Sequence, residues 1–347
     1  MSAADTNESP SAPFLPPLAV VPPWLTEPMA TLQRAWRGGR PPHALLIHEA
    51  PGAGGEWLAA WSAQLALCQR PDAPCGSCTA CRRAAARQHP DLAWLRPEGE
   101  SRQIRIEQVR ELCADLALTS HAAGGYKVGV ISPADALNRF AANALLKTLE
   151  EPPARTLLIL VATVPSRLPP TVVSRCQRLR VRAPTREQAL TWLAAARGAG
   201  EWNAALEVLG EAPLLAAQAD AAQVAAIGAE SRRALDELVR GEADPVAVAE
   251  RWARSQWPLR LQCFENWLTE RLRSGAGAAR FFAELRDDPY LSEHGAFLNI
   301  RELFRLLDEV RELRATLEVP LNRALAVEAL FRRLAPAPRV RVGATEV

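Results

Sequence analysis

Four cysteines lie close together in the chain, at positions 68, 75, 78 and 81. Two residues separate each of the last three, in a turn rich in proline and glycine, and such spacing brings successive thiolates onto one metal ion. Zinc prefers four soft ligands in a tetrahedron, and a site with four protein ligands leaves no position for water. Cys68, Cys75, Cys78 and Cys81 are therefore predicted to hold a structural zinc ion. The alternatives are a competing ligand at His89 or four ordinary small buried residues.

A glycine-rich loop is the second feature with possible chemistry. An apolar run at residues 43–48 precedes the loop at 51–54, and apolar residues at helical spacing follow it. This order is typical of loops that hold nucleotide phosphates through a lysine and magnesium through a Ser or Thr hydroxyl. Here Gly55 replaces the lysine, Glu56 replaces the hydroxyl and Glu49 replaces the first glycine. We expect the chain to bind no ATP.

The acidic half of an ATPase site is missing as well. In active enzymes an Asp-Glu pair follows the third strand, whereas here Ser132-Pro133 follows the apolar run at 126–131. No ATP hydrolysis is expected from this chain alone. A glycine turn without any ancestry in nucleotide binding remains the alternative.

Strands and helices alternate over the first half of the chain. Short apolar runs predict strands and apolar residues at helical spacing predict helices. The predicted strands are 43–48, 91–95, 126–131, 156–162 and 178–181, and the predicted helices are 56–67, 104–118 and 135–149. This alternation predicts an α/β fold with a parallel sheet covered on both faces.

The chain divides into four predicted segments. Residues 1–23 are rich in Pro, Ser and Ala and are predicted to be a disordered tail. Residues 24–184 form the sheet domain, with the zinc module inserted at about 68–90. Beyond residue 184 the strand signal disappears, and 185–222 and 223–347 are predicted as a small and a larger helical unit.

Several motifs resemble one protein family. Residues 142–153 (ANALLKTLEEPP) and Ser174-Arg175-Cys176 are typical of bacterial clamp-loader subunits. Combined with four cysteines and a degenerate loop, they resemble the delta prime family of DNA polymerase III subunits. The resemblance spans about residues 40 to 183, and the stretches at 43–47, 89–91 and 108–112 add to it.

The resemblance implies an AAA+ fold whose sheet domain is followed by an all-α lid and an all-α collar domain for oligomerisation. It implies that Arg175 acts in trans, as an arginine finger on ATP bound by a neighbouring motor subunit. The implied partners are the tau or gamma motor subunits and the delta subunit, with the sliding clamp and primed DNA reached through the complex. The complex loads the clamp onto DNA, and the chain would be classified with a DNA-directed DNA polymerase, a nucleotidyltransferase.

Composition excludes some other classes. Forty-one basic and thirty-nine acidic residues leave a net charge of +2, which excludes a histone-like polycation and an acidic disordered chain. With no apolar run of eighteen residues and no secretion signal, we expect no membrane span and a cytoplasmic location. The alternative function is a zinc-finger DNA-binding protein on a degenerate AAA+ scaffold, although few aromatic residues adjoin the cysteines. An intact ATPase is a third interpretation, disfavoured by Gly55, Glu56 and Ser132.

Overall fold

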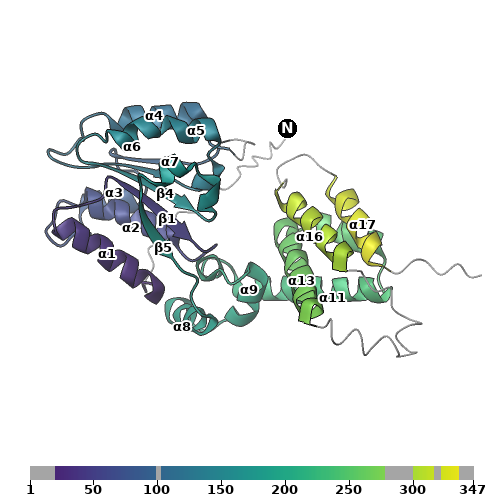
Figure 1. Cartoon of the computed structure of the whole chain (residues 1–347). Helices are drawn as coiled ribbons and strands as arrows, with labels where there is room; N and C mark the ends of the chain where they lie inside the picture. The colour runs from purple at the N-terminus through teal and green to yellow at the C-terminus, as the bar shows by residue number, and fades with distance from the viewer. Residues whose placement is uncertain (1–19, 99–102, 278–299, 316–321, 336–347) are drawn as a thin grey trace, which may run out of the picture. The chain divides into compact units, whose positions relative to one another are not determined.

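A computed structural model of the chain describes residues 20–98, 103–277, 300–315 and 322–335 (Figure 1). Residues 1–19 of the predicted tail lie outside this description. Contacts between residues divide the chain after Gly198 into a first unit with the sheet and a second, helical unit. The division falls inside the segment predicted as the lid, so the predicted limits of lid and collar remain a prediction.

The first unit contains a five-stranded sheet in the order β2-β3-β4-β1-β5. All neighbouring strands are parallel. The strands are β1 (Ala44–Glu49), β2 (Leu92–Leu95), β3 (Lys127–Ile131), β4 (Thr156–Ala162) and β5 (Gln177–Val181). The predicted parallel sheet is confirmed, and each strand lies within a residue or so of its predicted position.

Helices cover both faces of the sheet (Figure 1). One face carries α1 (Thr26–Arg37), α2 (Gly55–Leu67) and α3 (Thr79–Ala85). The other carries α4 (Ile106–Leu116), α5 (Arg139–Ala144), α6 (Leu146–Glu150) and α7 (Pro170–Val173). The unit ends with α8 (Arg186–Arg197), and Trp192 of this helix donates its indole N–H to the Val20 carbonyl at 2.9 Å.

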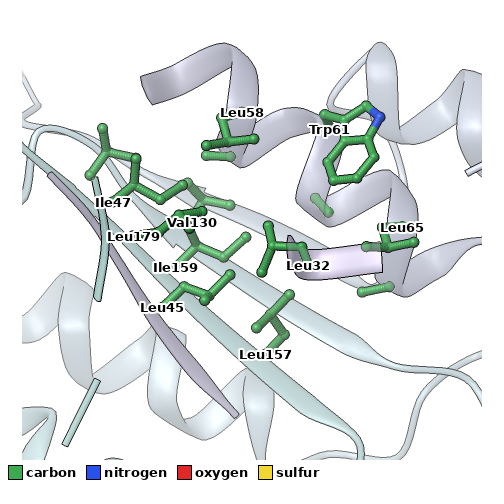
Figure 2. Packing of buried hydrophobic residues seen from close by; sticks show 14 of the residues in the cluster. Leu32, Leu45, Ile47, Leu58, Trp61, Leu65, Val130, Leu157, Ile159 and Leu179 are labelled. Atoms are coloured by element: carbon green, nitrogen blue, oxygen red, sulfur yellow. The ribbon is translucent and has the colours of Figure 1, made fainter. Parts of the chain in front are cut away.

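The strand β1 shows why both faces of the sheet are covered. Its Leu45 and Ile47 belong to one buried cluster together with Leu32 of α1 and Leu58 of α2 (Figure 2). Leu46, between them, belongs to the cluster on the opposite face, with residues of α4 and α5. Successive side chains of a strand point to opposite faces, so a continuous apolar run is what a doubly covered strand requires.

The prediction of one continuous helix at 135–149 is wrong. Leu137 forms a parallel bridge with Ile104 instead of continuing a helix. Asn138 has an extended backbone, and its side-chain oxygen accepts the Ala141 N–H at 2.9 Å. An asparagine cap of this kind starts a new helix, so the segment consists of a short 3-10 turn followed by α5 and α6.

The second unit is helical throughout its described residues. Its helices are α9 (Trp202–Leu209), α10 (Pro213–Ala216), α11 (Ala221–Arg240), α12 (Pro245–Arg254), α13 (Trp257–Gly277), α16 (Ile300–Ala315) and α17 (Arg323–Leu334). Trp252 is fully buried in its core, 5.0 Å from the Phe331 ring and 6.3 Å from that of Phe264, centroid to centroid. No helix among the described residues of either unit is long and apolar enough to cross a membrane.

Candidate metal centre and degenerate nucleotide loop

The four predicted cysteines meet at one point between α2 and β2. The Sγ atom of Cys68 lies 3.7 Å from that of Cys75 and 3.9 Å from that of Cys78, and Cys75 lies 4.0 Å from Cys81. All four sulfurs lie within 4.8 Å of one another. A tetrahedral zinc ion with bonds of about 2.3 Å separates its sulfur ligands by about 3.8 Å. The cluster therefore has the ligand set and the dimensions of a structural zinc site.

Local structure places these thiols. Cys68 follows directly after α2, and Cys78 caps α3, where its sulfur accepts the backbone N–H of Cys81 at 3.3 Å. The backbone N–H of Cys78 lies 3.4 Å from the Cys75 sulfur and lowers the pKa of that thiol to about 6. A lowered pKa favours the thiolate that binds metal, whereas burial raises the pKa of the Cys81 thiol. His89 is not part of this group of four cysteines, and its Nδ1 instead accepts the Asp91 N–H at 3.1 Å.

The glycine loop between β1 and α2 holds a carboxylate of its own chain. Glu49, the last residue of β1, accepts the backbone N–H of Gly54 at 3.2 Å and that of Gly55 at 2.5 Å with one oxygen, Oε2. In a nucleotide-binding loop such amides receive phosphate oxygens. The carboxylate of Glu49 therefore takes the place of an anionic ligand.

Two further observations describe the position of Glu49. Burial raises the pKa of this carboxyl group to about 6, although the amide of Gly55 acts in the opposite direction. A Cβ atom at Gly55 would lie only 2.6 Å from the Glu49 Cδ atom. A lysine at position 55, which an active loop needs, cannot be accommodated while Glu49 lies there.

The two positions that would hold magnesium contact each other instead. Ser132, after β3, donates its hydroxyl to Oε1 of Glu56 at 2.6 Å. Arg96 donates to both oxygens of Glu56, at 2.8 and 2.6 Å. Arg87 adds a second positive charge, with its Nη2 atom 3.8 Å from Oε2 of Glu56. Within the described residues, arginine nitrogens thus provide the positive charge that a metal ion provides in an active site.

Thr163 directly follows β4. Its backbone N–H and its hydroxyl both donate to Oδ2 of Asp135, at 2.8 and 2.7 Å. The Val164 N–H reaches the same carboxylate at 3.2 Å. These bonds connect the end of β4 to the segment after β3, which is a structural role.

Arg175 lies in the turn between α7 and β5. Cys176 beside it is buried and anchors the turn. The guanidinium of Arg175 forms an ion pair with Glu150 (Nη2 to Oε1, 2.7 Å) and donates from Nη1 to the Thr171 carbonyl at 2.9 Å. Its side chain is 36% exposed. The predicted site residues therefore lie in separate places: the cysteines after α2, and Arg175 before β5.

Arg175 and the glycine loop lie at opposite ends of the parallel strands. Gln177 of β5 is paired with Leu45, and Val181 with Glu49, so Arg175 precedes the start of β5 whereas the loop follows the end of β1. Four residue steps of strand span roughly 13 Å. Arg175 is therefore too far away to act on an anion in the loop of its own chain.

Sequence reasoning missed Glu49, Arg96 and Glu150 as partners. Glu49 was recognised only as a replacement for glycine, although a carboxylate at the end of a strand before a glycine loop is a usable signal. Arg96 was not recognised at all, because its partner Glu56 is 40 residues away in the sequence. No local pattern indicates such a pair.

Comparison with known proteins identifies the family. Residues 24–185 match the sequence family described as "DNA polymerase III, delta subunit". DNA polymerase III subunit delta' of Pseudomonas aeruginosa is 35% identical over 316 residues, which cover 87% of this chain and 94% of that protein. The subunit delta' of Escherichia coli is 33% identical, with 90% and 94% covered.

More distant similarity extends to related subunits. DNA polymerase III subunit tau of Escherichia coli is 36% identical over 152 residues, which are 43% of this chain and 23% of that protein. Among solved structures, a gamma subunit-related protein of Thermotoga maritima aligns with a TM-score of 0.39 and 18% identity, over 84% of this chain and 94% of that one. That score is too low to bear on the fold.

A parallel five-stranded sheet with a nucleotide-type loop, covered by helices on both faces and followed by a helical unit, defines an AAA+ protein of the clamp-loader type. The two relatives named delta' are similar over most of their length and most of this chain. The chain belongs to the delta prime subunit family of the DNA polymerase III clamp loader.

Proposed function

We propose that this chain is the non-hydrolysing subunit of a clamp loader. With motor subunits of the tau or gamma type and a delta subunit, it loads the sliding clamp onto primed DNA in ATP-dependent steps. Family membership supports the assignment. The loop supports the non-hydrolysing role, because Glu49 already accepts the amides of Gly54 and Gly55.

In this proposal Arg175 is an arginine finger for ATP bound by an adjacent motor subunit. Phosphoryl transfer builds charge on the γ-phosphate oxygens, and an arginine supplied in trans stabilises that charge. The observation that carries the proposal is the position of Arg175. It lies at the end of the strands opposite to its own loop, and its side chain is partly exposed. An arginine so placed is out of reach of its own loop and available to a ligand held by a neighbour.

The remaining parts have supporting roles in the proposal. Zinc, held by Cys68, Cys75, Cys78 and Cys81, supplies folding free energy to its module and takes no part in a reaction. The helical segment at about 223–347 mediates oligomerisation as a collar. Its described helices bury a large apolar core and bring no cluster of metal-ligating side chains together.

The experiment is reconstitution of a loader with this chain, its motor subunits and delta. Arg175→Ala should assemble normally but lose much of the DNA-stimulated ATPase and clamp-loading activity, by a partial amount because other interfaces keep their own arginines. Arg178→Ala is the matched control, since Arg178 lies exposed on β5 only three residues away. Wild-type rates for Arg175→Ala in both assays would remove this residue from the mechanism.

A further inference from the structure

Two signature motifs far apart in the sequence meet through one ion pair. Glu150, the last residue of α6, belongs to the motif at 142–153, and Arg175 belongs to the Ser-Arg-Cys motif. The Arg175 Nη2 atom lies 2.7 Å from Oε1 of Glu150. The Nη1 atom donates to the carbonyl of Thr171 in α7 at 2.9 Å. The guanidinium is thus held from two sides, by two different helices.

This ion pair adds little to the stability of the fold. The side chains of Arg175 and Glu150 are 36% and 50% exposed. Ion pairs that are so accessible to water contribute little, because the gain in Coulomb energy is offset by hydration and by side-chain entropy. An explanation for the pair must therefore lie in the orientation that it gives to the arginine.

The two contacts leave most of the guanidinium available. Arginine has five N–H donors in a rigid plane. One of these is donated to the Thr171 carbonyl, and the Nη2 atom forms the ion pair with Glu150, so other N–H groups have no hydrogen-bond partner among the described residues. These two contacts favour one orientation of the group before any ligand arrives, while donors remain for phosphate oxygens. A side chain oriented in advance loses less entropy when it meets its ligand.

We propose that Glu150 is a positioning residue that holds Arg175 in the orientation needed to contact a neighbour's γ-phosphate. The inference rests on the proposed function of Arg175. It assigns a role to the acidic end of the motif at 142–153 and connects it with the Ser-Arg-Cys motif of the same chain: one motif carries the arginine and the other orients it.

The chain offers a matched control one residue further on. Glu151 is also exposed and directly follows Glu150 at the end of α6, but its carboxylate makes no ion pair in the described part of the chain. A general effect of removing negative charge near Arg175 would appear in both variants. An effect of orientation would appear only in Glu150→Ala.

The test uses the complete reconstituted loader with Arg175→Ala, Glu150→Ala, Glu150→Gln, Glu151→Ala and the double variant of Arg175 and Glu150. The loss of ATPase rate in Glu150→Ala should be more than about half of the loss in Arg175→Ala. The reason is that misorientation of a catalytic group by about 1 Å is costly. The loss should appear in kcat, with KM for ATP changed by less than about twofold. Glu150→Gln, which keeps a neutral acceptor, should lie in between, and Glu151→Ala should equal wild type.

The double variant separates positioning from a structural role. If Glu150 acts only through Arg175, the double variant should be no slower than Arg175→Ala. Additive losses would overturn the inference, and so would a Glu150→Ala loader as active as Glu151→Ala. In both cases a slow Arg175→Ala loader would leave the proposed function standing. Wild-type activity of Arg175→Ala would instead overturn the proposed function and the inference together.

Discussion

Replacing Glu49 with glutamine should stabilise the chain at neutral pH and leave it unchanged in acid. Burial raises the pKa of this carboxyl group from 4.5 to about 6. Below pH 4.5 the group is protonated in the folded and the unfolded chain alike. As the pH rises through 4.5 to 6, the unfolded chain releases its proton first, so the free energy of unfolding falls. Glutamine resembles the protonated form at every pH.

The size of the effect follows from the shift. A difference of about 1.5 pKa units corresponds to about 2 kcal/mol. Glutamine keeps an oxygen that can accept the amides of Gly54 and Gly55, so the loop should persist. Urea unfolding followed by tryptophan fluorescence, at intervals from pH 4 to 8, measures the difference. Glu111→Gln, at an exposed position on α4, is the control and should change little. A Glu49→Gln variant less stable than wild type at pH 7.5 would refute the reasoning, because the carboxylate would then stabilise the loop.

Three further predictions concern the metal and the cores. Purified protein should contain about one zinc per chain by elemental analysis. Cys78→Ser should lose the metal and melt at a lower temperature, whereas Cys113→Ser should keep the metal. Wild-type protein that is purified without chelator and contains no metal would contradict this prediction. Leu32→Ala should cost about 2–5 kcal/mol in denaturant unfolding, because Leu32 is fully buried under the sheet. Gly228→Ala should cost about 1–3 kcal/mol, because the new Cβ would meet Val208 Cγ2 at 2.3 Å; an unchanged melting temperature would refute that contact.

The sheet was predictable because its signals are local. The apolar run predicted as a strand at 156–162 is β4, and the glycine loop marked the boundary between β1 and α2. Both depend only on neighbouring residues. The helix at 135–149 was predicted incorrectly because its apolar periodicity continues through residues whose backbone is diverted by a tertiary bridge at Leu137 and by the cap at Asn138.

The candidate site was predictable to different degrees. The cysteines were recognised because their spacing alone restricts how the sulfurs can meet, and four of four lie together. The degenerate loop was recognised by the residues it lacks. The carboxylate of Glu49 that fills it was not recognised, although its partners Gly54 and Gly55 are close in the sequence. The contact of Glu56 with Arg96 was missed because it joins α2 to a residue after β2 that is 40 positions away. The pairing of Arg175 with Glu150 was missed for the same reason.

The central claim is that side chains of this chain occupy its own nucleotide-type loop. The chain therefore acts only on ATP held by a neighbour. Titration calorimetry of the isolated chain with ATP and magnesium tests this most directly, with a motor subunit as the positive control. Glu49 on the amides of Gly54 and Gly55, and Arg96 on Glu56, predict no binding tighter than about millimolar, since phosphate would have to displace a carboxylate already bound there. Micromolar, magnesium-dependent binding would contradict the account.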